Sequence, residues 1–111
     1  MGIDAGTSRV RVLLFEVDGT LVAEASDEPP VKRPRTGWAS TKAEDLWESC
    51  LKAIRSVVAM VEKPDRIRSV AVASVGESAV PINAEGDAVY PMIAWYDCRT
   101  RPQARWLKKH I

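Results

Sequence analysis

The sequence predicts an α/β fold built around a mixed sheet, from three observations. Two apolar, strand-like runs near the N-terminus are joined by Asp18-Gly19, and an Asp-Gly pair between such runs is a strong hairpin signal. Apolar residues then recur at helical spacing between residues 46 and 61. A β-branched run at residues 67–75 follows that helix, and a helical crossover makes such a strand parallel to the first.

The first three strands are expected to form an antiparallel three-stranded meander. A short strand ends at Asp4, a second covers residues 9–16, and residues 21–26 alternate in polarity as a half-buried strand does. A turn at Gly6 joins the first two strands, and a turn at Gly19 joins the second to the third. The sheet is mixed because the strand after the helix runs parallel to the first.

The crossover helix is predicted to begin at a capping box formed by Thr41 and Glu44. Its apolar positions include Trp47 and Cys50, and the helical spacing assigns both side chains to the core. Lys63-Pro64 ends the helix, because the residue before a proline avoids helical geometry.

The C-terminal third is expected to hold a short strand at residues 79–83, a turn at 84–87 and a last helix with Pro102 in its first turn. The sequence stops inside that helical pattern without a helix-ending residue. The first strand also has almost no residues before Asp4, whereas a central strand has about five or six. Both features predict that the sequence is a fragment.

Size and composition indicate one ordinary globular domain and exclude several classes of partner. The chain has 111 residues, 46% of them hydrophobic and 28% charged. Its net charge is +1, so we expect neither a nucleic-acid nor a membrane partner. Cys50 and Cys98 are distant and His110 is the only histidine, which argues against a zinc site. Two lone cysteines favour a reducing, cytoplasmic setting.

The turn between the first two strands has the composition of an anion-binding loop. Gly6 allows a sharp bend and close approach of a ligand to the main chain. Thr7 and Ser8 place hydroxyls beside exposed backbone N–H groups, which favours an anion. Asp4 would repel a bare phosphate, so it suggests a bridging Mg²⁺ or an oriented water. A plain turn in which Asp4 caps the backbone is the alternative.

A resemblance follows from this loop and three later blocks. Asp4 to Ser8, followed by Arg11, resembles the first phosphate loop of the sugar-kinase, actin and heat-shock ATPase superfamily. The whole chain is similar to the N-terminal segment of the FGGY carbohydrate kinases, whose members are several times longer. The other blocks are Gly37-Trp38 with its helix, Val75-Gly76-Glu77-Ser78, and Trp95-Tyr96-Asp97-Cys98-Arg99 after Tyr90-Pro91. The resemblance implies a ribonuclease-H-like, actin-like fold, with residues 1–111 forming the front part of the first kinase domain.

On the phosphate side, the resemblance implies transfer of a phosphoryl group from Mg-ATP to a hydroxyl of a small sugar or polyol. Gly6, Thr7 and Ser8 are then the loop that contacts the ATP phosphates. Asp4 acts on Mg²⁺ through water, and Arg11 neutralises charge on the transferring group. A plain surface position on the strand is the alternative for Arg11. Family members supply the catalytic base and most of the adenine pocket from later sequence, so this chain alone is expected to be inactive.

On the acceptor side, the resemblance places sugar-contacting residues at Gly76 and Glu77. The glycerol kinases have Arg-Glu there, and Gly76 replaces the Arg, which argues for an acceptor larger than glycerol. Glu77 would accept hydrogen bonds from sugar hydroxyls, although an ordinary exposed carboxylate is the alternative. Trp95 is either a sugar-stacking wall or a packing residue. Asp97 and Arg99 lie on one side of an extended segment, so we expect them to pair and support the loop.

Two other hypotheses compete with the kinase. Phe15 to Leu21 resembles the first motif of haloacid-dehalogenase-type phosphatases, with Glu16 in the place of the nucleophilic Asp. Glu is one methylene too long for that geometry, and the alternating residues 21–26 indicate a strand where that family needs a loop and helix. The other hypothesis is a non-enzymatic nucleotide-binding or assembly domain of the same superfamily. Unpaired sheet edges also allow a homo-oligomer.

Overall fold

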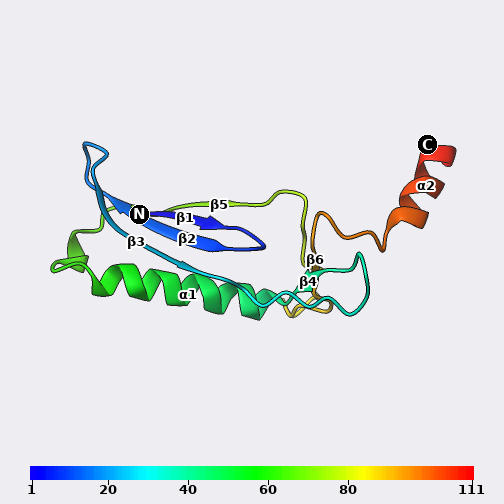
Figure 1. The fold of residues 1–111 in the computed structure, drawn as a ribbon, viewed down its shortest axis with the longest axis horizontal. Helices are drawn as coiled ribbons and strands as arrows, with labels where there is room; N and C mark the ends of the chain where they lie inside the picture. Colours follow the sequence, from blue (N-terminus) through cyan, green and yellow to red (C-terminus); the bar gives the residue numbers. More distant parts are fainter.

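The structure, a computed structural model, describes residues 1–111 and contains a four-stranded mixed sheet in one half of an elongated molecule (Figure 1). The order of the strands is β3-β2-β1-β5. Neighbours β1–β2 and β2–β3 are antiparallel, and β5 runs parallel to β1. The predicted meander and parallel crossover strand are both confirmed. The strands are β1 Gly2–Ala5, β2 Val10–Phe15, β3 Leu21–Asp27 and β5 Ala71–Ser74.

Helix α1 (Ala43–Ala59) covers one face of the sheet and forms the core with it (Figure 1). Because side chains alternate between the two faces of a strand, Val10, Val12 and Leu14 of β2 point to the helix and are buried. They pack with residues from the inner face of α1, including Cys50, Ala53 and Val57. The opposite face of the sheet carries Arg11 and Asp4, both exposed.

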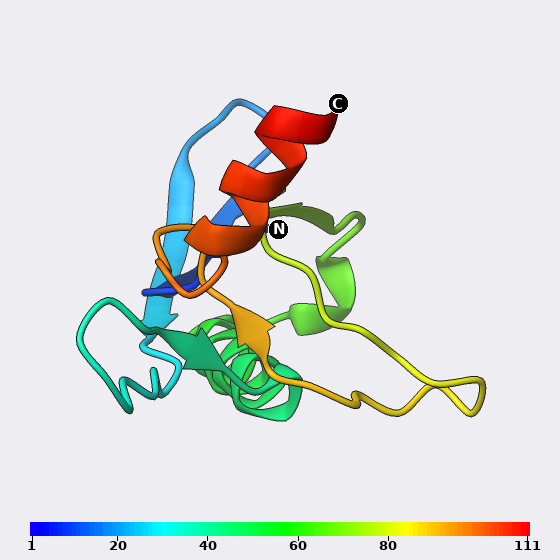
Figure 2. The ribbon, with the colours of Figure 1, turned by 90° about the vertical axis from the view of Figure 1, so that its right-hand side faces the viewer.

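Two predictions about α1 are wrong. The capping box of Thr41 and Glu44 does not form, because the N-cap is Lys42 and has no side-chain capping bond. Thr41 belongs instead to strand β4 (Ser40–Thr41), which pairs with β6 (Met92–Ile93) and buries the Thr41 side chain (Figure 2). Trp47 is 59% exposed rather than in the core. It lies about 100° round the helix from the centre of the buried stripe.

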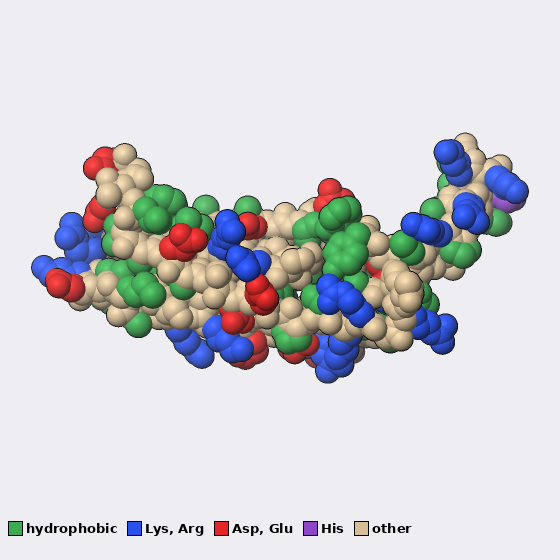
Figure 3. All heavy atoms as spheres, in the orientation of Figure 1, with side chains coloured by type: hydrophobic (Ala, Val, Ile, Leu, Met, Phe, Trp, Pro, Cys, Tyr) green, Lys and Arg blue, Asp and Glu red, His purple; other side chains and the backbone are tan.

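The C-terminal third is less regular than predicted. A 3₁₀ turn, η1 (Pro64–Arg66), precedes β5, which begins later than the expected strand at residue 67. The strand expected at residues 79–83 is wrong, since only a single bridge between Ile82 and Ala88 forms around the predicted turn. Helix α2 (Arg101–His110) has Pro102 in its first turn, as predicted. None of its residues is buried, and it stands apart from the sheet with lysine and arginine side chains over its surface (Figures 1 and 3).

The β2–β3 turn argues against the phosphatase hypothesis. A strand, β3, follows the turn directly, where that family needs a loop and helix. The Asp18 carboxylate accepts a hydrogen bond from the Thr20 N–H at 2.9 Å, and this bond lowers the pKa of Asp18. Gly19 has a φ of 90°, which favours glycine. Asp18 and Gly19 are therefore explained as turn residues. Neither helix of the chain is long and apolar enough to cross a membrane.

Candidate functional site

The phosphate-side loop is a tight turn that only glycine can complete. It joins the paired ends of β1 and β2, where Ala5 faces Val10. A Cβ atom added to Gly6 would lie 2.7 Å from the carbonyl oxygen of Arg9, well inside any normal contact. Ser8 is exposed, whereas Thr7 is 7% exposed. The loop therefore brings its main chain to the surface with little side-chain bulk over Gly6.

Asp4 and Arg11 are direct partners across the β1–β2 ladder, and Ala73 of β5 is the partner of Asp4 on its other side. Directly opposite residues place their side chains on one face, with Cβ atoms about 5 Å apart. Arg11 makes no ion pair with Asp4 or any other residue. Arg9, by contrast, pairs with Glu28 at 2.7 Å. Arg11 is therefore a free cation beside an exposed carboxylate.

These residues line one open hollow of about 870 Å³. The structure thus brings together every residue predicted for the phosphate side, and Trp95 from the other end of the chain joins them. The pair of Arg9 and Glu28 was not predicted from the sequence. The β2–β3 pairing explains this ion pair. Val10 lies opposite Asp27 at the end of the two strands, so Arg9 and Glu28, the residues just beyond them, lie close to each other. The lining residues are Asp4, Gly6, Thr7, Ser8, Arg9, Arg11, Glu28, Ala73, Ser74, Val75 and Trp95.

A second, smaller hollow of about 290 Å³ contains Glu77, predicted to contact the acceptor, together with Tyr90 and Trp95 in its wall. Trp95 lines both hollows, so it stands between them. Its side chain is 64% exposed and touches the Tyr96 ring edge-on, so it is not a core residue of this chain. Gly76 lines neither hollow. A Cβ atom added there would meet nothing within 4 Å, so the space beside Gly76 is open.

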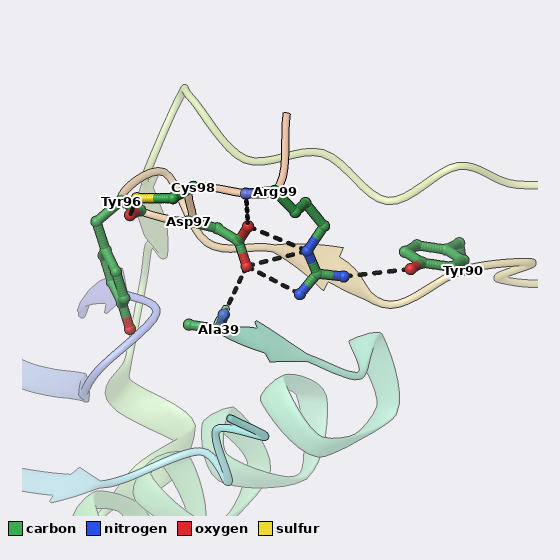
Figure 4. Close-up of polar contacts among 6 residues, drawn as sticks. All are labelled: Ala39, Tyr90, Tyr96, Asp97, Cys98 and Arg99. Carbon is green, nitrogen blue, oxygen red and sulfur yellow. Dashed lines mark hydrogen bonds and ion pairs between the residues drawn. The ribbon is translucent and has the colours of Figure 1, made fainter. Parts of the chain in front are cut away.

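Asp97 and Arg99 form the buried ion pair that the sequence predicted (Figure 4). Their side chains are 0% and 10% exposed, and the Arg99 Nη2 lies 2.8 Å from the Asp97 Oδ2. Asp97 also accepts hydrogen bonds from the backbone N–H groups of Ala39 and Arg99. The Arg99 guanidinium, helped by these N–H groups, outweighs the effect of burial and lowers the pKa of Asp97 to about 2.

The chain has no group of three side chains that could hold a metal ion by themselves. The phosphate-side hollow offers the carboxylates of Asp4 and Glu28, and Glu28 is already paired with Arg9. Mg²⁺ keeps several waters and is usually bound by one or two carboxylates together with substrate phosphates. A single carboxylate without an ion pair, Asp4, in the same hollow as the Gly6 turn fits that mode of binding.

Comparisons with known proteins agree with this arrangement. The FGGY family of carbohydrate kinases, N-terminal domain, matches residues 1–111. A glycerol kinase of Aquifex aeolicus is 32% identical over 99% of this chain and 22% of its own length, and one of Saccharolobus islandicus is 29% identical over 97% and 22%. The crystal structure of a xyloylose kinase from Brucella ovis matches with a TM-score of 0.92 and 29% identity, over 98% of this chain and 23% of that chain.

The chain thus spans under a quarter of the length of these relatives. The structural match confirms the fold that the resemblance implied, in which a mixed sheet carries the Gly6 turn at the ends of its two central strands. Because the family match covers all 111 residues, the chain belongs to the FGGY family of carbohydrate kinases and matches the N-terminal domain of that family.

Proposed function

We propose that the protein containing this chain transfers a phosphoryl group from ATP to a hydroxyl of a small sugar or polyol. The observation that carries the proposal is the position of Trp95 between the phosphate-side hollow and the hollow that contains Glu77. Phosphoryl transfer requires the donor phosphate and the acceptor hydroxyl to be held side by side. The names of the relatives, glycerol kinase and xyloylose kinase, support an acceptor of this class.

On the phosphate side, the Gly6 turn binds phosphate oxygens through its backbone N–H groups. The missing Cβ supports this role indirectly, because a Cβ atom would lie 2.7 Å from the Arg9 carbonyl oxygen and the tight turn that presents these N–H groups could not form. Ser8 is exposed and adds its hydroxyl, whereas the burial of Thr7 favours a contribution from its backbone N–H. The turn thereby orients the donor phosphates relative to the sheet edge.

Asp4 and Arg11 have complementary roles: Asp4 acts on the positively charged magnesium ion, and Arg11 acts on the negatively charged phosphoryl group. Asp4 would hold Mg²⁺ through water, and the ion would neutralise part of the phosphate charge. Arg11 stabilises the charge that develops on the transferring phosphoryl group, as a cation placed beside that group does. The lack of any ion pair at Arg11, and its place opposite Asp4 in the ladder, support this assignment.

On the acceptor side, Glu77 accepts hydrogen bonds from sugar hydroxyls and Trp95 provides an apolar wall. Glu77 is exposed and has no ion-pair partner, so its carboxylate is available. Gly76 has no side chain where the glycerol kinases have Arg, and this difference is the basis for proposing an acceptor larger than glycerol. The two free cysteines remain the reason to place the protein in the cytoplasm.

The first test is the mass of the native polypeptide, followed by a panel of sugars and polyols with the full-length protein. We expect a polypeptide several times heavier than 12.3 kDa and ATP consumption that depends on the sugar. The 111-residue chain by itself should not turn over ATP. If the native polypeptide ended near Ile111, the catalytic base and adenine pocket would be missing, and a nucleotide-binding or assembly domain would replace the kinase as the proposal.

A further inference from the structure

Trp95 is carried by a turn whose two ends are tied to the same residue, Ala39. The N–H of Asp97 donates to the carbonyl of Ala94 at 2.9 Å, so Trp95 and Tyr96 are the two central residues of a four-residue turn. The N–H of Ala94 donates to the carbonyl of Ala39 at 3.0 Å. The N–H of Ala39 in turn donates to Oδ2 of Asp97 at 2.5 Å (Figure 4). One tie is backbone to backbone, and the other depends on a side chain.

The Asp97 carboxylate is itself held by Arg99. The Nε atom of Arg99 lies 3.0 Å from both carboxylate oxygens. The guanidinium also lies over the ring of Trp38, 4.3 Å from its centre, and donates from Nη1 to the Tyr90 hydroxyl at 3.2 Å. Contacts with Asp97, Trp38 and Tyr90 hold the planar guanidinium in place. Its rigid fork of N–H donors in turn fixes the orientation of the Asp97 carboxylate. The bonds from Ala39 and Arg99 fill the lone-pair sites of Asp97, so its side chain has none left for a ligand.

Trp95 has little else to fix it. Its side chain is 64% exposed, makes no hydrogen bond and has one aromatic neighbour, Tyr96, on the same turn. Its position between the two hollows is therefore set by the turn. We propose that Asp97 and Arg99 are positioning residues that hold Trp95 at the acceptor site through Ala39. This inference rests on the proposed kinase function, and it assigns neither residue a contact with the acceptor.

The kinetic test uses the full-length protein and the acceptor found in the sugar panel. Asp97→Asn should raise the acceptor KM by roughly ten- to a hundredfold, since a misplacement of about 1 Å can cost about 10²-fold. The KM for ATP should stay within about twofold, because the phosphate loop is not part of the network. Asp87→Asn is the matched control, because Asp87 is an exposed turn carboxylate whose side-chain bond goes to Asn83.

A double-mutant cycle asks whether Asp97 acts through Trp95. In a Trp95→Ala background, Asp97→Asn should raise the acceptor KM no further, because the group that it positions is gone. Additive effects of Asp97→Asn and Trp95→Ala would overturn the inference. Arg99→Lys keeps the charge but loses the planar fork, so an intermediate KM is expected. If Asp97→Asn does not fold, Arg99→Lys is used in its place in the cycle with Trp95→Ala, and additive effects on the acceptor KM would again overturn the inference.

A spectroscopic readout separates the inference from the proposed function. The protein is labelled with 5-fluorotryptophan, and the Trp95 resonance is assigned by its loss in Trp95→Phe. In Asp97→Asn that ¹⁹F resonance should shift or broaden, while in Asp87→Asn it should not change. An unchanged resonance in Asp97→Asn would refute the positioning role even in an active kinase. A shifted resonance in a protein that phosphorylates no sugar would instead refute the proposed function and leave the positioning role standing.

Discussion

Gly6→Ala is the sharpest perturbation of the phosphate loop. The new Cβ atom would lie 2.7 Å from the carbonyl oxygen of Arg9, whereas an ordinary contact begins at 3.4 Å. The shortfall is 3.4 − 2.7 = 0.7 Å, and the atom in the way belongs to the backbone, so the loop itself must move. Forcing an extra methyl group into a tight space costs about 1–3 kcal/mol. The backbone N–H groups proposed to bind phosphate would be displaced by a similar distance.

A displacement of this size should weaken function more than folding. A misplacement of about 1 Å can cost about 10²-fold in rate, so we expect kcat/KM for ATP to fall by roughly 30- to 100-fold. The assays are steady-state kinetics and calorimetric titration of the full-length protein with ATP. Gly2→Ala is the matched control, because Gly2 begins strand β1, which leads into the Gly6 turn, and its added Cβ would meet nothing within 4 Å. If Gly6→Ala bound ATP as tightly as Gly2→Ala, the loop would not be the phosphate site.

Three further outcomes are expected. Arg11→Gln should lower kcat by about 10²–10³-fold with little change in acceptor KM, since it removes a charge that acts in the transition state. Arg9→Gln is the control, because the Arg9 guanidinium is already paired with Glu28. An equal loss of kcat in Arg9→Gln would contradict the role of Arg11. Gly76→Arg should fold normally and shift the ratio of kcat/KM towards glycerol over larger acceptors, because the space beside Gly76 is open; an unchanged ratio would remove Gly76 from the acceptor site. Asp97 should titrate near pH 2 in carboxyl ¹³C spectra. Because folding lowers the pKa of Asp97, the stability that its carboxylate contributes is present above about pH 4 and is lost as the pH falls towards 2. A titration midpoint of Asp97 near 3.8 would show that the pair with Arg99 is not formed.

The central sheet was predictable because its determinants are local. The Asp18-Gly19 turn sets the β2–β3 hairpin, the small residues around Gly6 set the β1–β2 turn, and a helix between strands makes β5 parallel to β1. The candidate phosphate-side residues come together through that topology, since the register of β1 and β2 in the structure makes Asp4 and Arg11 ladder partners.

The errors lie where distant segments pair. Thr41 satisfies the local rule for a capping box, but its pairing with Met92 draws it into a strand, and helix α1 begins after it. Trp47 satisfies the helical spacing but lies beside the stripe that the sheet covers. The role of Ala39 was not predictable at all. Its contribution is a backbone N–H and carbonyl, and no side chain in the sequence signals which peptide group will receive Asp97.

The Ala39 tie also has a consequence for the order in which the chain folds. It joins residues 58 positions apart, whereas the β1–β2 and β2–β3 pairs join neighbours in sequence. Closing a long loop costs chain entropy before its contacts repay it, so distant pairings form more slowly than local ones. The hairpins that carry the Gly6 turn should therefore assemble first. The pairing of β5 with β1 spans 69 positions, so both this pairing and the Ala39 tie should follow the hairpins. Protection of the hairpin N–H groups from hydrogen exchange before those of β5 and Ala39 is the expected kinetic signature of this connectivity.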